Sequence, residues 1–271
     1  MTGPKLAAMK IDDVTGILRE AAEAVILPRF GSLAAGEVSE KSQGELVTVA
    51  DREAEALISR RLRELLDAPV VGEEATAADP TLPRALTESP AAWVVDPIDG
   101  TGNFVAGRPG FAVMAALVRD GETVAGWILR PVEGTAYVAE RGSGAWRDGL
   151  RLRRDPAPAG AAGLHGDVMT RFLDAPDRAR VAAAASRFAS LGRGASCAGV
   201  DYPRVVEGER DFVLYRRILP WDHAPGTLLL EEAGGHARRL DGSRYLPGED
   251  RTGLLAAADP ESWQQARSLL T

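Results

Sequence analysis

Two aspartates close an apolar segment, WVVDPIDGT, at residues 93–101. The run before Asp96 predicts a buried strand, and Pro97 fixes the direction of the chain so that Asp99 returns close to Asp96. Two carboxylates held this close repel each other unless a cation lies between them. Because hard oxygen ligands on a rigid turn suit Mg²⁺, the segment predicts a magnesium site.

The residues after Asp99 could bind phosphate. If a helix begins there, the backbone N–H groups of Gly100 and Thr101 point outward, and such groups bind anions. A simpler interpretation is that Asp99 only caps this helix and that nothing is bound. The segment alone leaves both interpretations open.

Further carboxylates follow other predicted elements. Glu73 and Glu74 come directly after the short apolar run 69–71, and Asp222 begins an apolar helix at Trp221. Taken singly, Glu73 and Glu74 are better explained as an exposed acidic turn and Asp222 as a helix cap. Together, with no histidine or cysteine cluster that would suggest zinc, they predict a site of oxygen ligands for two or more Mg²⁺ ions.

Two other kinds of active site fit poorly. Gly100 and Gly102 are followed next by Gly107, so the spacing of a dinucleotide-binding loop is not met. The segment around Ser196 resembles a nucleophile elbow only loosely because its last glycine is missing. With three histidines in the chain, a Ser-His-Asp hydrolase is disfavoured.

Three motifs resemble the signature regions of the inositol monophosphatase family, in the family's order. They are GEE at 72–74, DPIDGTGNF at 96–104, and WDHA at 221–224 with its EAGG ending at 232–235. The likeness extends from Lys41 to the last predicted helix. It implies a five-layered αβαβα sandwich of mixed α/β and α+β character, usually dimeric, that hydrolyses phosphate monoesters with Mg²⁺ and is often inhibited by lithium.

The resemblance also implies roles for individual residues. Two or three Mg²⁺ ions are expected in each active site. Asp51 and Thr101, with Glu73, would activate water beside the first metal, and Lys41 would lie on a loop near the site. The first metal would be held by Glu73, Asp96 and the carbonyl of Ile98, and the second by Asp96, Asp99 and Asp222. Residues expected to contact the substrate are Gly100, Thr101, Ser196, Ala198, Tyr215 and Asp222.

The substrate is where this sequence departs from the family. Inositol-preferring members have an acidic residue seven positions before the aspartate of the WD motif, and here that position is Tyr215. The expected substrate is a small inositol-phosphate or sugar-phosphate type of monoester. The alternatives are a 3′-phosphoadenosine nucleotide, histidinol phosphate, or a non-catalytic binding role on the same fold. Arg216 and Arg217 either face an extra negative group on the substrate or are solvated.

The elements that must position these residues follow from periodicity. Apolar residues at helical spacing predict helices over 14–30 and 50–65, the second capped by Thr48. Runs at 69–71 and 92–95 predict strands that end in acidic residues at a sheet edge, and 111–119, 124–130 and 135–140 predict antiparallel strands. Helices are expected at 178–189, 198–207, 222–232 and after Asp259, with strands at 212–215 and 254–258. The Pro- and Ala-rich stretch 155–166 predicts a boundary between an N-terminal α+β half, 1–154, and a C-terminal α/β half, 155–271.

Composition narrows the remaining classes. The chain has 271 residues, 45% of them hydrophobic, and a net charge of −7, which argues against binding to nucleic acid. Its one cysteine, Cys197, allows no internal disulfide and is expected to be a small buried residue. No apolar stretch is long enough to span a membrane. We therefore expect a cytoplasmic homodimer that acts on a small phosphorylated substrate.

Overall fold

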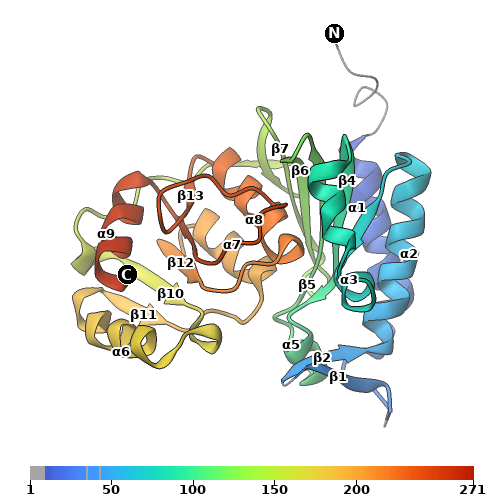
Figure 1. The fold of residues 1–271 in the computed structure, drawn as a ribbon, viewed down its shortest axis with the longest axis horizontal. Coiled ribbons are helices and arrows are strands. Elements are labelled where there is room, and N and C mark those ends of the chain that lie inside the picture. Colours follow the sequence, from blue (N-terminus) through green and yellow to red (C-terminus); the bar gives the residue numbers. More distant parts are fainter. Residues whose placement is uncertain (1–9, 35, 43) are drawn as a thin grey trace.

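Helices and sheets alternate in five layers, αβαβα, in the computed structural model, which describes residues 10–271 except 35 and 43 (Figure 1). Within these residues no helix is both long enough and apolar enough to cross a membrane. The layered architecture predicted from the resemblance is confirmed.

The first sheet has seven strands in the order β3-β4-β5-β6-β7-β8-β9. Every neighbouring pair is antiparallel except β3 and β4, which run parallel. The predicted strands at 111–119, 124–130 and 135–140 are thus confirmed as an antiparallel meander. The strands are β3 (Val70–Gly72), β4 (Ala91–Asp99), β5 (Ala112–Arg119), β6 (Glu122–Arg130), β7 (Thr135–Glu140), β8 (Gly144–Arg147) and β9 (Leu150–Leu152).

The second sheet has five strands in the order β11-β10-β12-β14-β13. Strand β10 is parallel to β11 and β12, and the other pairs are antiparallel. The first sheet ends at Leu152 and the second begins after the stretch 155–164, but the division of the chain into two domains stays a prediction. The strands are β10 (His165–Val168), β11 (Ser190–Gly192), β12 (Phe212–Tyr215), β13 (His236–Arg239) and β14 (Leu254–Ala257).

Helices form the three remaining layers, with α1 and α2 on one outer face, α7 and α8 between the sheets, and α6 and α9 on the other outer face (Figure 1). Short elements line the edges: hairpin β1–β2, helices α3, α4 and α5, and several short turns. Their bounds are α1 (Ile11–Ala21), α2 (Val49–Leu65), α3 (Glu73–Ala78), α4 (Ala85–Glu88), α5 (Thr101–Val105), α6 (Ala175–Ala184), α7 (Ala198–Val206), α8 (Pro220–Glu232), α9 (Pro260–Leu270), β1 (Val38–Ser42) and β2 (Glu45–Thr48).

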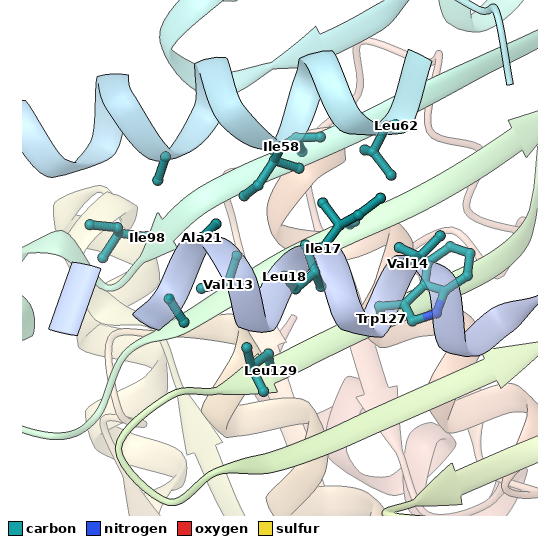
Figure 2. Close-up of a cluster of buried hydrophobic side chains, with 14 of the residues drawn as sticks. Val14, Ile17, Leu18, Ala21, Ile58, Leu62, Ile98, Val113, Trp127 and Leu129 are labelled. Carbon is teal, nitrogen blue, oxygen red and sulfur yellow. The ribbon is translucent and has the colours of Figure 1, made fainter. Parts of the chain in front are cut away.

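The outer helices α1 and α2 pack on the first sheet through one apolar stripe each, as Figure 2 shows. Val14, Leu18 and Ala21 face the strands that carry Val113 and Trp127, and all of them are buried. The predicted helix 14–30 begins at Ile11 and ends as a π-helical turn, Ala22–Ile26, and a 3-10 turn, Leu27–Arg29, which contains Pro28. Proline cannot donate an N–H to the helix, which explains the change.

Helix α8 is buried from Trp221 to Leu230 except at Asp222. A helix that is apolar on all sides belongs in a core, and here it lies between the two sheets. Where α7 crosses α8, a Cβ on Gly226 would come within 2.1 Å of the Tyr202 ring, so only glycine permits this approach. The middle layer therefore holds the start of α8 rigidly against both sheets.

Candidate active site

The register of β3 and β4 places two acidic residues side by side. Gly72 pairs with Val95 in the parallel ladder, and the next residue of each chain segment is an acid, Glu73 directly after β3 and Asp96 within β4. Parallel neighbours end at the same edge of a sheet. The expectation that these strands deliver carboxylates to one edge of the sheet is thus met.

A β-bulge brings Asp96 and Asp99 together. Residues three apart on a regular strand point to opposite faces of the sheet. Here Asp96 pairs with Met114 and Asp99 with Ala112, so two residues of β4 lie opposite the single residue between those partners. The Ile98 N–H donates to Asp96 Oδ1 at 3.0 Å and holds the turn.

Asp222 completes a group of three carboxylates. Asp96, Asp99 and Asp222 each offer an oxygen atom, and these atoms lie within 4.8 Å of one another. Burial, followed by the neighbouring negative charges, raises the pKa of Asp96 and of Asp222 well above the ordinary value. Burial likewise raises the pKa of Asp99 to about 6, although a hydrogen bond from Gly199 partly offsets it. Positive charge between them would stabilise the ionised form of such crowded carboxylates.

Neither Asp99 nor Asp222 is the N-cap of the helix that follows it or contains it. Gly100 is the N-cap of α5, with φ +84°, and a Cβ there would come within 3.0 Å of the Gly110 carbonyl oxygen. Asp99 instead accepts hydrogen bonds from Gly199 N at 2.6 Å and Cys197 Sγ at 3.1 Å, at the start of α7. Helix α8 has Leu219 as its N-cap. The capping interpretation of Asp99 is therefore wrong for α5, and Asp222 is not an N-cap.

Asp51 and Thr101 form a second group beside the carboxylates. Thr101 Oγ1 lies 2.9 Å from the Ile98 carbonyl and 3.3 Å from Asp51 Oδ1. Asp51 Oδ2 accepts from the N–H and the hydroxyl of Thr48, which completes the predicted cap of α2. Burial raises the pKa of Asp51 to about 7, partly offset by these hydrogen bonds. Hydrogen bonds from Thr48 to Asp51 and from Thr101 to the Ile98 carbonyl thus hold Asp51 and Thr101 in place.

Lys41 lies between two carboxylates at the end of β3. Its Nζ is 2.7 Å from Glu73 Oε1 and 2.6 Å from Glu74 Oε1. These acids raise the pKa of Lys41 more than its burial lowers it. Glu73 is thus paired with the ammonium and is not one of the three grouped aspartates.

Glu55 holds the start of α3, the segment that contains Glu73 and Glu74. Its carboxylate accepts the backbone N–H groups of Glu74 at 2.7 Å and Ala75 at 2.8 Å. A Cβ on Gly72 would come within 2.4 Å of the Glu55 carboxyl carbon, so glycine is required there. Sequence reasoning missed Glu55, although it lies one helical turn after Asp51 on the same face of α2.

One cavity of about 340 Å³ contains nearly all of the predicted residues. This is within the size range of small-molecule sites. Lys41 and Asp51 do not line it but contact residues that do. Of the predicted residues, those that line it are Glu73, Asp96, Ile98, Asp99, Gly100, Thr101, Ser196, Ala198, Tyr215, Arg216, Arg217 and Asp222.

Tyr215 forms part of an aromatic wall of this cavity. Its ring stacks on Tyr202 at 5.6 Å and meets His223 edge-on at 4.6 Å. Tyr202 and His223 are joined by a 3.0 Å hydrogen bond, and burial lowers the pKa of His223 to about 3, so the imidazole is neutral. The Tyr215 hydroxyl is buried and has no hydrogen-bond partner among the described residues.

Two further residues were missed or only partly understood. Asn103 Nδ2 donates to the carbonyls of Gly110 and Ala195 and so ties α5 to the loop before α7. Cys197 is buried, as expected, but its thiol also donates to Asp99. No spacing in the sequence signals either contact, because both join segments remote in the chain.

Comparisons with known proteins identify the family. A model of the inositol monophosphatase family matches residues 10–270. An inositol-1-monophosphatase of Mesorhizobium japonicum is 34% identical over 80% of each chain, and a fructose-1,6-bisphosphatase/inositol-1-monophosphatase of Thermotoga maritima is 32% identical over 75% of each. The Escherichia coli Nus factor SuhB is 30% identical over 83% of this chain and 82% of that protein.

Solved structures show the same fold. An IMPase of Thermotoga maritima aligns with a TM-score of 0.80 at 26% identity over 96% of each chain. The extragenic suppressor protein suhB of Bartonella henselae aligns with a TM-score of 0.83 at 25% identity over 96% of this chain and 98% of that one. The chain therefore belongs to the inositol monophosphatase family. Both the resemblance in the sequence and the expectation of a phosphoric monoester hydrolase are confirmed.

Burial raises the pKa of Glu55 to about 7, so the carboxylate is mostly ionised at about pH 8. At that pH we expect Glu55→Gln to lower the free energy of unfolding by about 1–3 kcal/mol. Glutamine offers one acceptor oxygen, and its NH₂ group would face one of the two N–H groups of Glu74 and Ala75. Urea denaturation measures the loss. Glu53→Gln, at an exposed position on the same helix, should change stability by less than about 1 kcal/mol. Equal stability of the Glu55 variant and the native protein would show that these bonds contribute little.

Proposed function

We propose that this protein hydrolyses a small phosphate monoester, of the inositol-phosphate or sugar-phosphate type, with Mg²⁺ as cofactor. The observation that carries the proposal is the group of Asp96, Asp99 and Asp222, with oxygen atoms within 4.8 Å, in the same cavity as Thr101. A site with only oxygen ligands suits Mg²⁺ better than zinc.

The donor set supports two or three ions. Glu73, Asp96 and the Ile98 carbonyl would hold one ion, and Asp96, Asp99 and Asp222 a second. On binding this ion, the Glu73 carboxylate would either keep its ion pair with Lys41 or break it. If that pair breaks, the ion pair with Glu74 still holds the Lys41 ammonium in place. When bound, Mg²⁺ lowers the pKa of water and neutralises charge on the phosphate and the leaving oxygen.

The chain's own groups would orient water and substrate. The Thr101 hydroxyl has one proton, and donating it to Asp51 or the Ile98 carbonyl leaves a lone pair that can accept a hydrogen bond from water. Asp51, with its raised pKa, is suited to take up a proton at neutral pH. Gly100 and Thr101 begin α5, where backbone N–H groups lack partners inside the helix and would bind the phosphate.

The names of the relatives support the substrate class. Two of them are named for inositol-1-monophosphatase activity, one also for fructose-1,6-bisphosphatase. A 3′-phosphoadenosine nucleotide and histidinol phosphate remain the alternative substrates. A homodimer in the cytoplasm stays the prediction for assembly and location.

A panel of phosphate monoesters tests the proposal. Phosphate release would be measured with Mg²⁺ for myo-inositol 1-phosphate, a sugar phosphate, glycerol phosphate, histidinol phosphate and a 3′-phosphoadenosine nucleotide. Hydrolysis of at least one with metal-dependent turnover supports the proposal. No release from any of them, by protein that is folded, would contradict it.

We expect myo-inositol 1-phosphate not to be the best substrate of the panel. Tyr215 presents an aromatic side chain with a buried hydroxyl to the cavity where an acid would bind ring hydroxyls. Introducing that acid as Tyr215→Glu should raise kcat/KM for inositol phosphate relative to glycerol phosphate by at least about tenfold, the scale of a hydrogen bond to a charged group. Tyr215→Phe keeps the aromatic stack and serves as the control. A native preference for inositol phosphate would refute this interpretation of Tyr215.

One observation favours a role without hydrolysis. The Escherichia coli relative is named a Nus factor, which is not the name of an enzyme. The same assays decide between the two functions, because a binding role alone predicts no turnover of any monoester. Retention of all the carboxylates that would bind metal supports hydrolysis.

A further inference from the structure

The loop before α7, residues 193–197, has a strained backbone where it lines the cavity. Gly194 has φ +71° and Ser196 has φ +56°, so two left-handed residues flank Ala195. Such a φ is uncommon for serine, because its Cβ crowds the following carbonyl oxygen. Two other non-glycine residues of the described chain have a positive φ, Asp120 and Asp148, and both lie in turns. Of the three, Ser196 lines the cavity, and it is exposed there.

Two buried side chains hold the residue between these two left-handed positions. The Ala195 N–H donates to Asp201 Oδ1 at 2.8 Å, and the Ala195 carbonyl accepts from Asn103 Nδ2 at 2.9 Å. Asp201, in the first turn of α7, is 1% exposed, and Asn103, in α5, is 9% exposed. Because backbone strain persists only where the surrounding structure fixes it, these two contacts account for the conformation of Ser196.

Further contacts orient the Asn103 amide. Its Nδ2 also donates to the Gly110 carbonyl at 2.6 Å, and its Oδ1 accepts from Arg108 Nη2 at 2.9 Å and Nε at 3.1 Å. An amide placed between two carbonyls and a guanidinium has one orientation that satisfies all of them. Helix α5 begins at Thr101, which would bind the phosphate. Asn103 therefore fixes the loop relative to the phosphate end of the site.

Asp201 carries a charge that a hydrogen bond to one N–H does not need. Burial raises its pKa to about 7, although the N–H of Ala195 lowers it, and its Oδ2 atom is buried without a hydrogen-bond partner among the described residues. Arg204 Nη1 lies 3.7 Å from Asp201 Oδ1 but nearer, at 3.2 Å, to Asp167. A charged acceptor makes a hydrogen bond roughly twice as strong as a neutral one, so at about pH 8 the carboxylate holds the strained loop more firmly than an amide would.

We infer that Asp201 and Asn103 are positioning residues that act through Ser196 on the leaving group of the substrate. By holding Ala195 from both sides, they keep the Ser196 side chain on the cavity wall in a conformation that serine otherwise avoids. The inference rests on the proposed function, because it requires a substrate in this cavity. Selectivity for the leaving group then depends on a buried residue, Asp201, that does not itself line the cavity.

Two substrates of different size test the inference. The kcat/KM of the best substrate of the monoester panel is divided by that of methyl phosphate, both measured with Mg²⁺ at about pH 8. Methyl phosphate has a leaving group of one carbon, so a general effect on the metal site acts on both substrates and cancels in the ratio. Asp201→Ala and Asn103→Ala should each lower the ratio by at least about tenfold, mainly through KM, the scale of losing one hydrogen bond to the leaving group. Asp201→Asn should lower it less, because its oxygen still accepts the Ala195 N–H.

Ser196→Gly changes stability and selectivity in opposite directions. Glycine adopts a positive φ without strain, and this relief exceeds the extra entropy of glycine in the unfolded chain, so Tm should rise by about 1–3 °C. The ratio should nevertheless fall, because the side chain is lost. Asp259→Ala is the matched control: it removes a carboxylate that accepts the Ser262 N–H at 2.8 Å at the start of α9, outside the cavity. It should lower Tm and leave the ratio as it is.

The outcomes separate this inference from the proposed function. If both substrates are hydrolysed but the ratio is unchanged in Asp201→Ala and Ser196→Gly, the inference is wrong and the proposed function stands. The inference is also wrong if Asp259→Ala lowers the ratio as much as Asp201→Ala does, since the effect then belongs to stability. Should Asp201→Ala fail to fold, Asp201→Asn and Ser196→Gly decide in the same way. If the native protein releases phosphate from neither substrate, the proposed function itself fails, and this inference with it.

Discussion

Asp99→Asn should lower kcat by at least about a hundredfold, the scale of losing one preorganised electrostatic group. The change keeps the size of the side chain, and its oxygen can still accept the hydrogen bonds from Gly199 and Cys197. It removes the charge that would bind metal beside Asp96 and Asp222. Steady-state assays on the best substrate of the panel measure the loss.

Stability distinguishes lost chemistry from lost structure in this variant. Without metal, the three aspartates repel one another, and asparagine removes one of these charges. The Tm of Asp99→Asn in chelator should therefore be no lower than that of the native protein. Asp67→Asn, which removes an exposed charge in the turn before β3, should leave kcat and Tm as they are. Near-normal turnover by folded Asp99→Asn would show that Asp99 has a structural role only.

Removal of divalent metal should abolish phosphate release, and added Mg²⁺ should restore it. Metal ions contribute several kcal/mol to such reactions, which corresponds to a loss of at least about a thousandfold in rate. Ca²⁺ should inhibit, because its longer bonds and looser geometry place the reacting groups wrongly. Phosphate release in excess chelator, before and after addition of each metal, measures these effects.

Thermal unfolding provides a second measure of metal binding. A ligand that binds only the folded state raises Tm, so Mg²⁺ should stabilise the native protein. The increase should be smaller in Asp99→Asn, which lacks one ligand, and unchanged in Asp67→Asn. Full activity in excess chelator would overturn the metal hypothesis whatever the Tm.

Several parts of the fold were predictable because their signals are local. Thr48 and Asp51 cap α2 through contacts within one turn of helix, and the antiparallel strands β5 to β7 follow one another through short turns. Strands β1, β2, β8–β11 and β13 were not predicted. All of these are short, with five residues or fewer, and their mixed polar and apolar residues show no clear period of two.

The sequence by itself determined that Asp96 and Asp99 lie close together, because a strand, a proline and a bulge act within a few residues. Its three motifs also indicated the family. It did not predict that Glu55 accepts a hydrogen bond from the backbone of Glu74, or that Asp99 accepts one from Gly199 in α7. These contacts join residues 19 and 100 positions apart. Only tertiary packing decides which remote segments become neighbours.

The contacts of Arg171 and Arg217 also depend on tertiary structure alone. Arg171 meets Gly44 across 127 residues, and Arg217 meets Glu45 across 172. Taken as sequence, Arg216 and Arg217 fit solvation and substrate binding equally well, because local composition does not say what a side chain faces. The position of Arg217 over the Phe172 ring follows from the packing of α7 and α8 between two sheets, which brings the end of β12 to the hairpin β1–β2.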